Sequence, residues 1–148
     1  MRMLTIISRT EQETETLAGK LAKSLFPGAF LALRGGLGAG KTAFTRGLGE
    51  AMGIHDVMSP TFTIVQEHKG LLHFDAYRLG SAEELYDIGF EDYLNRGSII
   101  VMEWPEMAEE ALPQERLEVL IEGSGNAERT LTFTAYGEEY EKLLSEAF

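Results

Sequence analysis

The segment from Gly35 to Thr42 has the residue types and the spacing of a loop that binds phosphate groups. Gly35 is followed by four residues and then by Gly40, Lys41 and Thr42, which fits the pattern G-x-x-x-x-G-K-[ST]. Glycines let the backbone turn tightly enough for several N–H groups to face one anion, and a helix beginning near Lys41 would add its positive dipole end. We expect Lys41 to reach the β- and γ-phosphates and the Thr42 hydroxyl to bind Mg²⁺. The predicted nucleotide-binding loop consists of Gly35, Gly36, Leu37, Gly38, Ala39, Gly40, Lys41 and Thr42.

Two carboxylates follow apolar runs and are candidates for the accompanying chemistry. Asp75 follows "LLHF", and Glu103 follows "IIVM". Enzymes with a phosphate loop need an acidic residue at the end of a neighbouring strand to hold Mg²⁺, and both positions qualify. His73 lies two residues before Asp75 and therefore on the same strand face. A structural histidine and one that orients Asp75 are both open readings, and the histidine spacing does not suit zinc.

The segment "SPTFT" places hydroxyl groups at Ser59, Thr61 and Thr63 on a loop stiffened by proline. Small nucleotide switches place a threonine that senses Mg²⁺ and the γ-phosphate in such a connection, although a plain turn would also explain the sequence. Trp104 follows Glu103 and would either stack on a ligand or pack in the protein.

The apolar patterns predict an α/β fold that would bring these groups together. Helical spacing or capping signals mark the segments 10–25, 41–52, 81–94 and 138–148, and strand patterns mark the segments 3–7, 29–33, 61–68, 71–75, 98–104, 116–123 and 129–136. Alternation of the two types predicts a three-layer sandwich of the P-loop NTPase type. Its central sheet would be mainly parallel, with additional antiparallel strands.

The overall composition limits the possible partners. The 148 residues fit one domain spanning 1–148, and the net charge of −11 argues against direct binding of DNA or RNA by the protein's own surface. There is no cysteine, so disulfides and thiolate metal sites are excluded. The first residues are too short an apolar run for a signal peptide or a membrane span, which predicts a cytoplasmic protein without a membrane partner.

Five motifs taken in order resemble the TsaE family, also called YjeE. They are "GGLGAGKT", "SPTFT", "HFDAYR", "EELYDIGFEDYL" and "EWPE", and the resemblance extends from about residue 10 to residue 130. It implies a Mg²⁺-dependent ATPase required for threonylcarbamoyl modification of adenosine 37 in tRNAs that read codons beginning with adenine. The family acts with the TsaD–TsaB complex and supports its turnover without transferring the group itself, so tRNA would be met through these partners.

The same resemblance implies roles for individual residues. Thr42 and Glu103 would bind Mg²⁺, and Asp75 would be an essential carboxylate near the metal or the attacking water, with Lys41 on the phosphates. Other residues would surround the nucleotide: Thr61 and Thr63 in a switch loop, Trp104 beside the site, and Thr10, Glu11 and Arg129 near the base.

One residue departs from the family pattern, and alternative functions stay open. The family usually has an acidic or polar residue where this chain has Gly36, which implies slower hydrolysis if that side chain helps to place Mg²⁺. A small-molecule kinase would use the same loop, but the chain after Glu103 offers only Arg116 and Arg129 for a lid. A GTP switch is disfavoured because the N-K-x-D motif is absent. A nucleotide-gated binding module that barely hydrolyses ATP is the alternative outside the enzymes.

Overall fold

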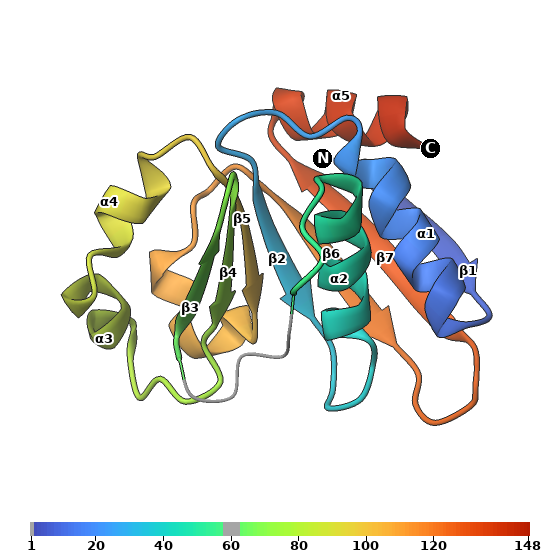
Figure 1. Cartoon of the computed structure of the whole chain (residues 1–148), viewed down its shortest axis with the longest axis horizontal. Helices are drawn as coiled ribbons and strands as arrows, with labels where there is room; N and C mark the ends of the chain where they lie inside the picture. Colours follow the sequence, from blue (N-terminus) through green and yellow to red (C-terminus); the bar gives the residue numbers. More distant parts are fainter. Residues whose placement is uncertain (1, 58–62) are drawn as a thin grey trace.

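Seven strands form one sheet at the centre of the chain, shown in Figure 1. The computed structural model describes residues 2–57 and 63–148. The strand order is β1-β7-β6-β2-β5-β4-β3. The strands are β1 (Arg2–Ser8), β2 (Phe30–Arg34), β3 (Val65–His68), β4 (Leu71–Asp75), β5 (Ile99–Glu103), β6 (Arg116–Glu122) and β7 (Arg129–Tyr136). The helices are α1 (Glu11–Ala22), α2 (Lys41–Ala51), α3 (Ala82–Asp87), α4 (Phe90–Leu94), α5 (Glu138–Ala147) and the 3₁₀ segment η1 (Pro105–Ala111).

The sheet has a parallel centre and antiparallel edges, as the sequence predicted. β6, β2, β5 and β4 run parallel to one another. Antiparallel pairs join β1 to β7, β7 to β6 and β3 to β4. The first four residues of β2 are completely buried, because helices cover both faces of a parallel sheet. A hairpin through Lys69 and Gly70 joins β3 to β4, with Gly70 in the left-handed region that its turn requires. The carboxyl ends of β2, β4 and β5 therefore meet at one edge.

Two layers of helices enclose the sheet, which confirms the expected α/β sandwich. Leu31 and Leu33 of β2 pack with α1, α2 and α5, while Phe30 and Ala32 pack with α3, α4 and η1. Figure 1 shows α1 and α2 side by side over one face, with α5 across their ends. The alternation along β2 thus divides the core into two halves.

α1 and α2 approach each other so closely that a side chain would not fit between them. A Cβ added at Gly47 would lie 2.3 Å from the backbone oxygen of Glu15. The N-terminus of α1 is fixed by the predicted cap, in which the Thr10 hydroxyl accepts a hydrogen bond from the N–H of Glu13 at 3.0 Å. Because α2 starts at the phosphate loop, the close contact between α1 and α2 at Gly47 fixes the direction in which the loop enters α2.

The predicted helix over residues 81–94 is in fact two short helices. Gly89 adopts a left-handed conformation between α3 and α4, which an uninterrupted α-helix does not contain. Ser81 precedes α3 without a side-chain cap, and Glu84 instead accepts a hydrogen bond from the N–H of Gly80 at 3.2 Å. The predicted tail helix forms as α5 and packs on the sheet, with Tyr140, Leu143, Leu144 and Ala147 buried.

Among the described residues, no helix is long and apolar enough to cross a membrane.

Candidate functional site

The glycine-rich loop lies between the end of β2 and the start of α2, where the motif predicts a phosphate site. Gly35, Gly38 and Gly40 all have positive φ angles of 152°, 77° and 110°. At Gly35 a Cβ would also lie 2.5 Å from the carbonyl oxygen of Ile121, so the end of β6 presses against the loop. The glycines are therefore required by backbone conformation and by close contact.

Lys41 is buried at the base of this loop. Its Nζ donates a hydrogen bond to the carbonyl oxygen of Gly35 at 2.6 Å and lies 3.2 Å from the ring centroid of Trp104. Burial lowers the pKa of Lys41, and the charges of Glu103, Glu106 and Asp75 oppose this shift. The ammonium group is thus held close to the loop by interactions that an anionic ligand could replace.

Asp75 and Glu103 lie next to each other at the carboxyl ends of β4 and β5. They are partners in the parallel register, and the N–H of Ala76 donates to the carbonyl oxygen of Glu103 at 3.0 Å. Because β5 also pairs with β2, the two carboxylates stand beside the strand that leads into the phosphate loop. Their placement follows the rule that ligands bind at the carboxyl edge of open α/β sheets.

The environment of Asp75 disfavours its charge. Burial raises the pKa of Asp75, and the neighbouring Glu103 carboxylate raises it further. The N–H of Tyr77 donates to Asp75 Oδ1 at 2.9 Å and favours the ionised form, but burial outweighs it. A carboxylate that lacks full compensation is suited to accepting a proton or meeting a cation.

His73 lies on the same face of β4 as Asp75, as predicted, but its ring contacts Glu103. Its Nε2 lies 2.5 Å from Glu103 Oε2, and both side chains are almost completely buried. In the described part of the chain, His73 Nδ1 is buried without a hydrogen-bond partner. His73 thus presents Nε2, and not Nδ1, to the Glu103 carboxyl group.

Trp104 has the only positive φ angle among the described residues other than glycine, with φ 57° and ψ 47°. This conformation costs a large side chain about 1–3 kcal/mol. It lets the chain turn from β5 into η1 while the indole ring lies below Lys41 and 4.9 Å from the ring of Tyr77. The strain thus positions an aromatic wall beside the loop.

A cavity of about 400 Å³ joins these groups. Lys41, Thr42, Asp75, Glu103 and Trp104 all line it, together with the loop residues Leu37, Gly38, Ala39 and Gly40. The oxygens of one hydroxyl and two carboxylates are ligands that Mg²⁺ accepts, with the remaining positions taken by water and phosphate. No cluster of three or more His, Cys, Asp or Glu suited to a metal is found in residues 2–57 and 63–148. This donor set therefore fits an ion shared with a phosphate ligand.

A second cavity of about 390 Å³ lies along the same loop. Thr10, Glu11 and Arg129 line it, as do Gly38, Ala39 and Gly40. Glu11 belongs to both cavities, so the three residues that the resemblance places near the base lie next to the phosphate loop. This cavity extends from Thr10 to the turn before β7.

Two of the remaining sequence candidates are not placed in these cavities. Thr61 lies outside the described residues, and Thr63 is exposed before β3 and does not line either cavity among the residues described. Gly36 has ordinary φ, and a Cβ there would meet no atom within 4 Å. Position 36 would therefore accept a Cβ without a clash.

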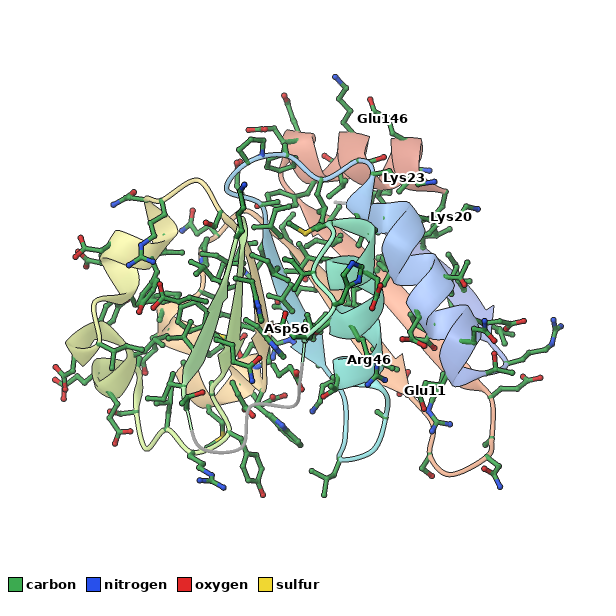
Figure 2. The ribbon with its side chains drawn as sticks, viewed as in Figure 1. Glu11, Lys20, Lys23, Arg46, Asp56 and Glu146 are labelled. Atoms are coloured by element: carbon green, nitrogen blue, oxygen red, sulfur yellow. The ribbon has the colours of Figure 1, made fainter. Side chains whose placement is uncertain are left out.

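Arg46 and Tyr77 both line the larger cavity, and neither was among the predicted site residues. Arg46 donates hydrogen bonds to Glu11 at 2.7 Å and Glu15 at 3.1 Å, and so links α2 to α1. Figure 2 shows Arg46 and Glu11 at the loop end of these two helices. A helical register would have put Arg46 one turn beyond Lys41 and Thr42, but only the packing of α1 against α2 shows its partner.

Comparison with known proteins gives consistent matches. A family model described as "Threonylcarbamoyl adenosine biosynthesis protein TsaE" matches residues 8–131. The tRNA threonylcarbamoyladenosine biosynthesis protein TsaE of Bacillus subtilis is 43% identical over 140 residues, covering 91% of this chain and 87% of that protein. Its counterpart in Rickettsia conorii is 42% identical over 129 residues, covering 81% of this chain and 71% of that protein.

Comparison of the whole fold with solved structures supports the same family. The crystal structure of Bacillus subtilis YdiB superimposes with a TM-score of 0.84 at 37% sequence identity, covering 99% of this chain and 94% of the other. Sequence and structure agree over nearly the whole length, and the chain therefore belongs to the TsaE family.

Proposed function

We propose that the protein is a Mg²⁺-dependent ATPase that supports threonylcarbamoyl modification of adenosine 37 in tRNA. The observation that carries the proposal is the single cavity that brings Lys41, Thr42, Asp75 and Glu103 to the glycine-rich loop. The names of the TsaE relatives supply the pathway. Adenine is the preferred base because the sequence lacks the guanine-reading motif N-K-x-D.

Each residue has a defined part in this mechanism. The loop N–H groups and Lys41 Nζ donate to phosphate oxygens, and Lys41 exchanges its bond to Gly35 for the ligand. The Thr42 hydroxyl and the Glu103 carboxylate would hold Mg²⁺, and the bound ion would supply positive charge to neutralise the phosphates. Asp75 faces the same space and accepts a proton from, or orients, the attacking water.

The two arginines that a kinase lid could use are both hydrogen-bonded within the protein. Arg116 donates to Glu118 at 2.5 Å and to the carbonyl oxygen of Pro113 at 2.9 Å. Arg129 donates to carbonyl oxygens of the phosphate loop and of the turn before β7. Hydrolysis therefore explains the arrangement better than transfer to a small-molecule acceptor.

The acidic surface favours an indirect role on tRNA. A net charge of −11 does not support strong binding to a polyanion, so the TsaD–TsaB complex would supply the tRNA surface. In this proposal, ATP hydrolysis in the cytoplasm supports turnover of that complex, while the threonylcarbamoyl group is transferred elsewhere.

Phosphate release from Mg²⁺-ATP tests the proposal. It is measured for the protein alone and with TsaD, TsaB and tRNA, using the wild type, Asp75→Ala, and Asp56→Ala as a control in which an 82% exposed carboxylate is removed. We expect stimulated release in the wild type and the control, and loss in Asp75→Ala with ATP still bound. Bound ATP without release in any mixture would instead indicate a nucleotide-dependent assembly factor.

A further inference from the structure

The guanidinium of Arg129 donates four hydrogen bonds, all to main-chain carbonyl oxygens. Nε donates to Ala39 at 2.9 Å and Nη2 to Gly38 at 3.3 Å, both in the phosphate loop. Nη1 donates to Ala127 at 2.6 Å and Nη2 to Gly125 at 3.0 Å, both in the turn between β6 and β7. Arginine has five N–H donors, and four of them tie this turn to the loop.

The surroundings of Arg129 are shaped for its side chain. At Gly123, which has φ 125°, a Cβ would lie 3.0 Å from Arg129 Cδ and 2.5 Å from the carbonyl oxygen of Glu128. Arg129 also pairs in register with Ser8 of β1, so its backbone is part of the sheet. The guanidinium therefore reaches the loop from a rigid base over a position that only glycine fits.

These bonds constrain the peptide planes of the loop. A trans peptide is planar and directs its C=O and N–H to opposite sides. With the Ala39 carbonyl held against Arg129, the N–H of Gly40 points away from it. With the Gly38 carbonyl held as well, the N–H of Ala39 turns inward and donates to the Gly36 oxygen at 3.1 Å. The Gly38 and Ala39 carbonyl oxygens are thus held on the Arg129 side of the loop, opposite the N–H groups of their own peptides.

We propose that Arg129 is a positioning residue of the phosphate loop, and that it acts by holding the Gly38 and Ala39 carbonyls outward. This assignment differs from a contact with the base, which the sequence resemblance implies for the same residue. It rests on the proposed function, because it takes the loop to be the triphosphate site. Its consequence is that Arg129 determines affinity for the phosphates whatever base is attached.

The substitution Arg129→Lys separates the effect of hydrogen-bond geometry from the effect of charge. It would keep the positive charge beside the loop, but one ammonium group lacks the planar fork that meets carbonyls on two segments. Arg129→Met removes the charge as well and keeps much of the side-chain length. Arg2→Lys is the matched control, since Arg2 lies on the adjacent strand β1 and bonds Ser145 far from the loop.

The test measures the affinity of each full-length variant for ATP and for inorganic tripolyphosphate, and amide hydrogen exchange over residues 36–40. For both Arg129→Lys and Arg129→Met we expect about tenfold weaker binding of both ligands, by the same factor, because charged hydrogen bonds organise the loop. Amide exchange in the loop should accelerate without nucleotide. Arg2→Lys should stay within about twofold of the wild type.

Other results would overturn the assignment. Loss of ATP affinity with unchanged tripolyphosphate affinity would make Arg129 a contact to the nucleoside. If Arg129→Lys matched the wild type in both ligand affinity and amide exchange, a positive charge at this position would be sufficient. The hydrogen-bond geometry of the guanidinium would then not be required. If the wild type bound neither ATP nor tripolyphosphate, the proposed function itself would be wrong, which differs from a defect confined to the Arg129 variants.

Discussion

Two groups of charged residues flank β2 on opposite faces of the sheet, and they differ in how the charge of their carboxylates is balanced. On the face covered by η1, Glu118 receives hydrogen bonds from Arg34 and Arg116, and Arg34 also bonds Glu109. On the face covered by α2, Asp75 and Glu103 stand side by side in the cleft. Below, the first group is called the arginine network and the second the carboxylate pair.

The two groups differ in the direction in which the pKa of a buried carboxyl group is shifted. Burial alone would raise the pKa of Glu118, but the two arginines outweigh it and lower that pKa. At Asp75 burial prevails, and the pKa is raised. The arginine network is thus neutralised internally and stabilises the fold, whereas the carboxylate pair is left short of positive charge, as a site for a cation would be.

The largest effect is expected in the cleft. Lys41→Ala should weaken ATP binding by about 1.5–3 kcal/mol, or about tenfold to a hundredfold, because charged hydrogen bonds to phosphate are lost. Titration calorimetry measures it, and Lys20→Ala on the exposed face of α1 is the control. Equal ATP affinity in Lys41→Ala and the wild type would show that the cleft does not use its lysine.

For the arginine network we expect a loss of stability with little change in ATP affinity. Arg34→Met should lower the free energy of unfolding by about 1.5 kcal/mol and Tm by about 5 °C, because Glu118 loses a partner in a mostly buried position. ATP affinity should stay within about threefold. Arg96→Met, which breaks an exposed pair with Glu67, should leave Tm unchanged. A loss of ATP affinity without loss of Tm in Arg34→Met would contradict the division between the groups.

Acid should reduce the contribution of Glu118. Its folded pKa is lowered, so its stabilisation is present above the unfolded pKa of about 4.3 and is lost as pH falls through the folded value. Glu118→Gln should therefore be less stable than the wild type by about 1 kcal/mol at pH 7. Urea unfolding at a series of pH values should show this gap narrowing below about pH 4.3. A constant gap would mean that the charge of Glu118 is irrelevant.

The smallest change in stability is expected at Asp75, and its sign is opposite to that expected at Glu118. The folded pKa of Asp75 is raised, so its ionised form destabilises the protein above that pKa, and the penalty disappears at acidic pH. Asp75→Asn should therefore raise Tm by about 2 °C at pH 7 while abolishing ATP hydrolysis, as is common for active-site residues. Thermal unfolding checks this, and a lower Tm at pH 7 would show that Asp75 is structurally compensated.

The sequence predicted the elements better than the partners of individual side chains. Alternation correctly placed His73 and Asp75 on one face of β4, but the register with β5 brings Glu103 within reach of His73. That register depends on pairing between segments far apart in the chain. Arg34 and Glu118 are likewise 84 residues apart, and nothing local links them.

Local conformation explains the other differences. The apolar pattern of residues 81–94 is continuous, yet Gly89 ends α3 because its left-handed backbone is more favourable there than a further helical turn. The phosphate loop was predictable because its chemistry depends on glycines at fixed spacing. The bonds of Arg129 were not, because main-chain carbonyls leave no signature in the residue types that they belong to.

The left-handed Trp104 gives the protein an optical reporter. It is the only tryptophan in the chain, and the Lys41 ammonium lies 3.2 Å from its ring centroid. Indole emission responds to nearby charge, so movement of Lys41 onto a phosphate should change the fluorescence without any added dye. The ring that forms a wall of the cleft would thus report, in real time, when the cleft is filled.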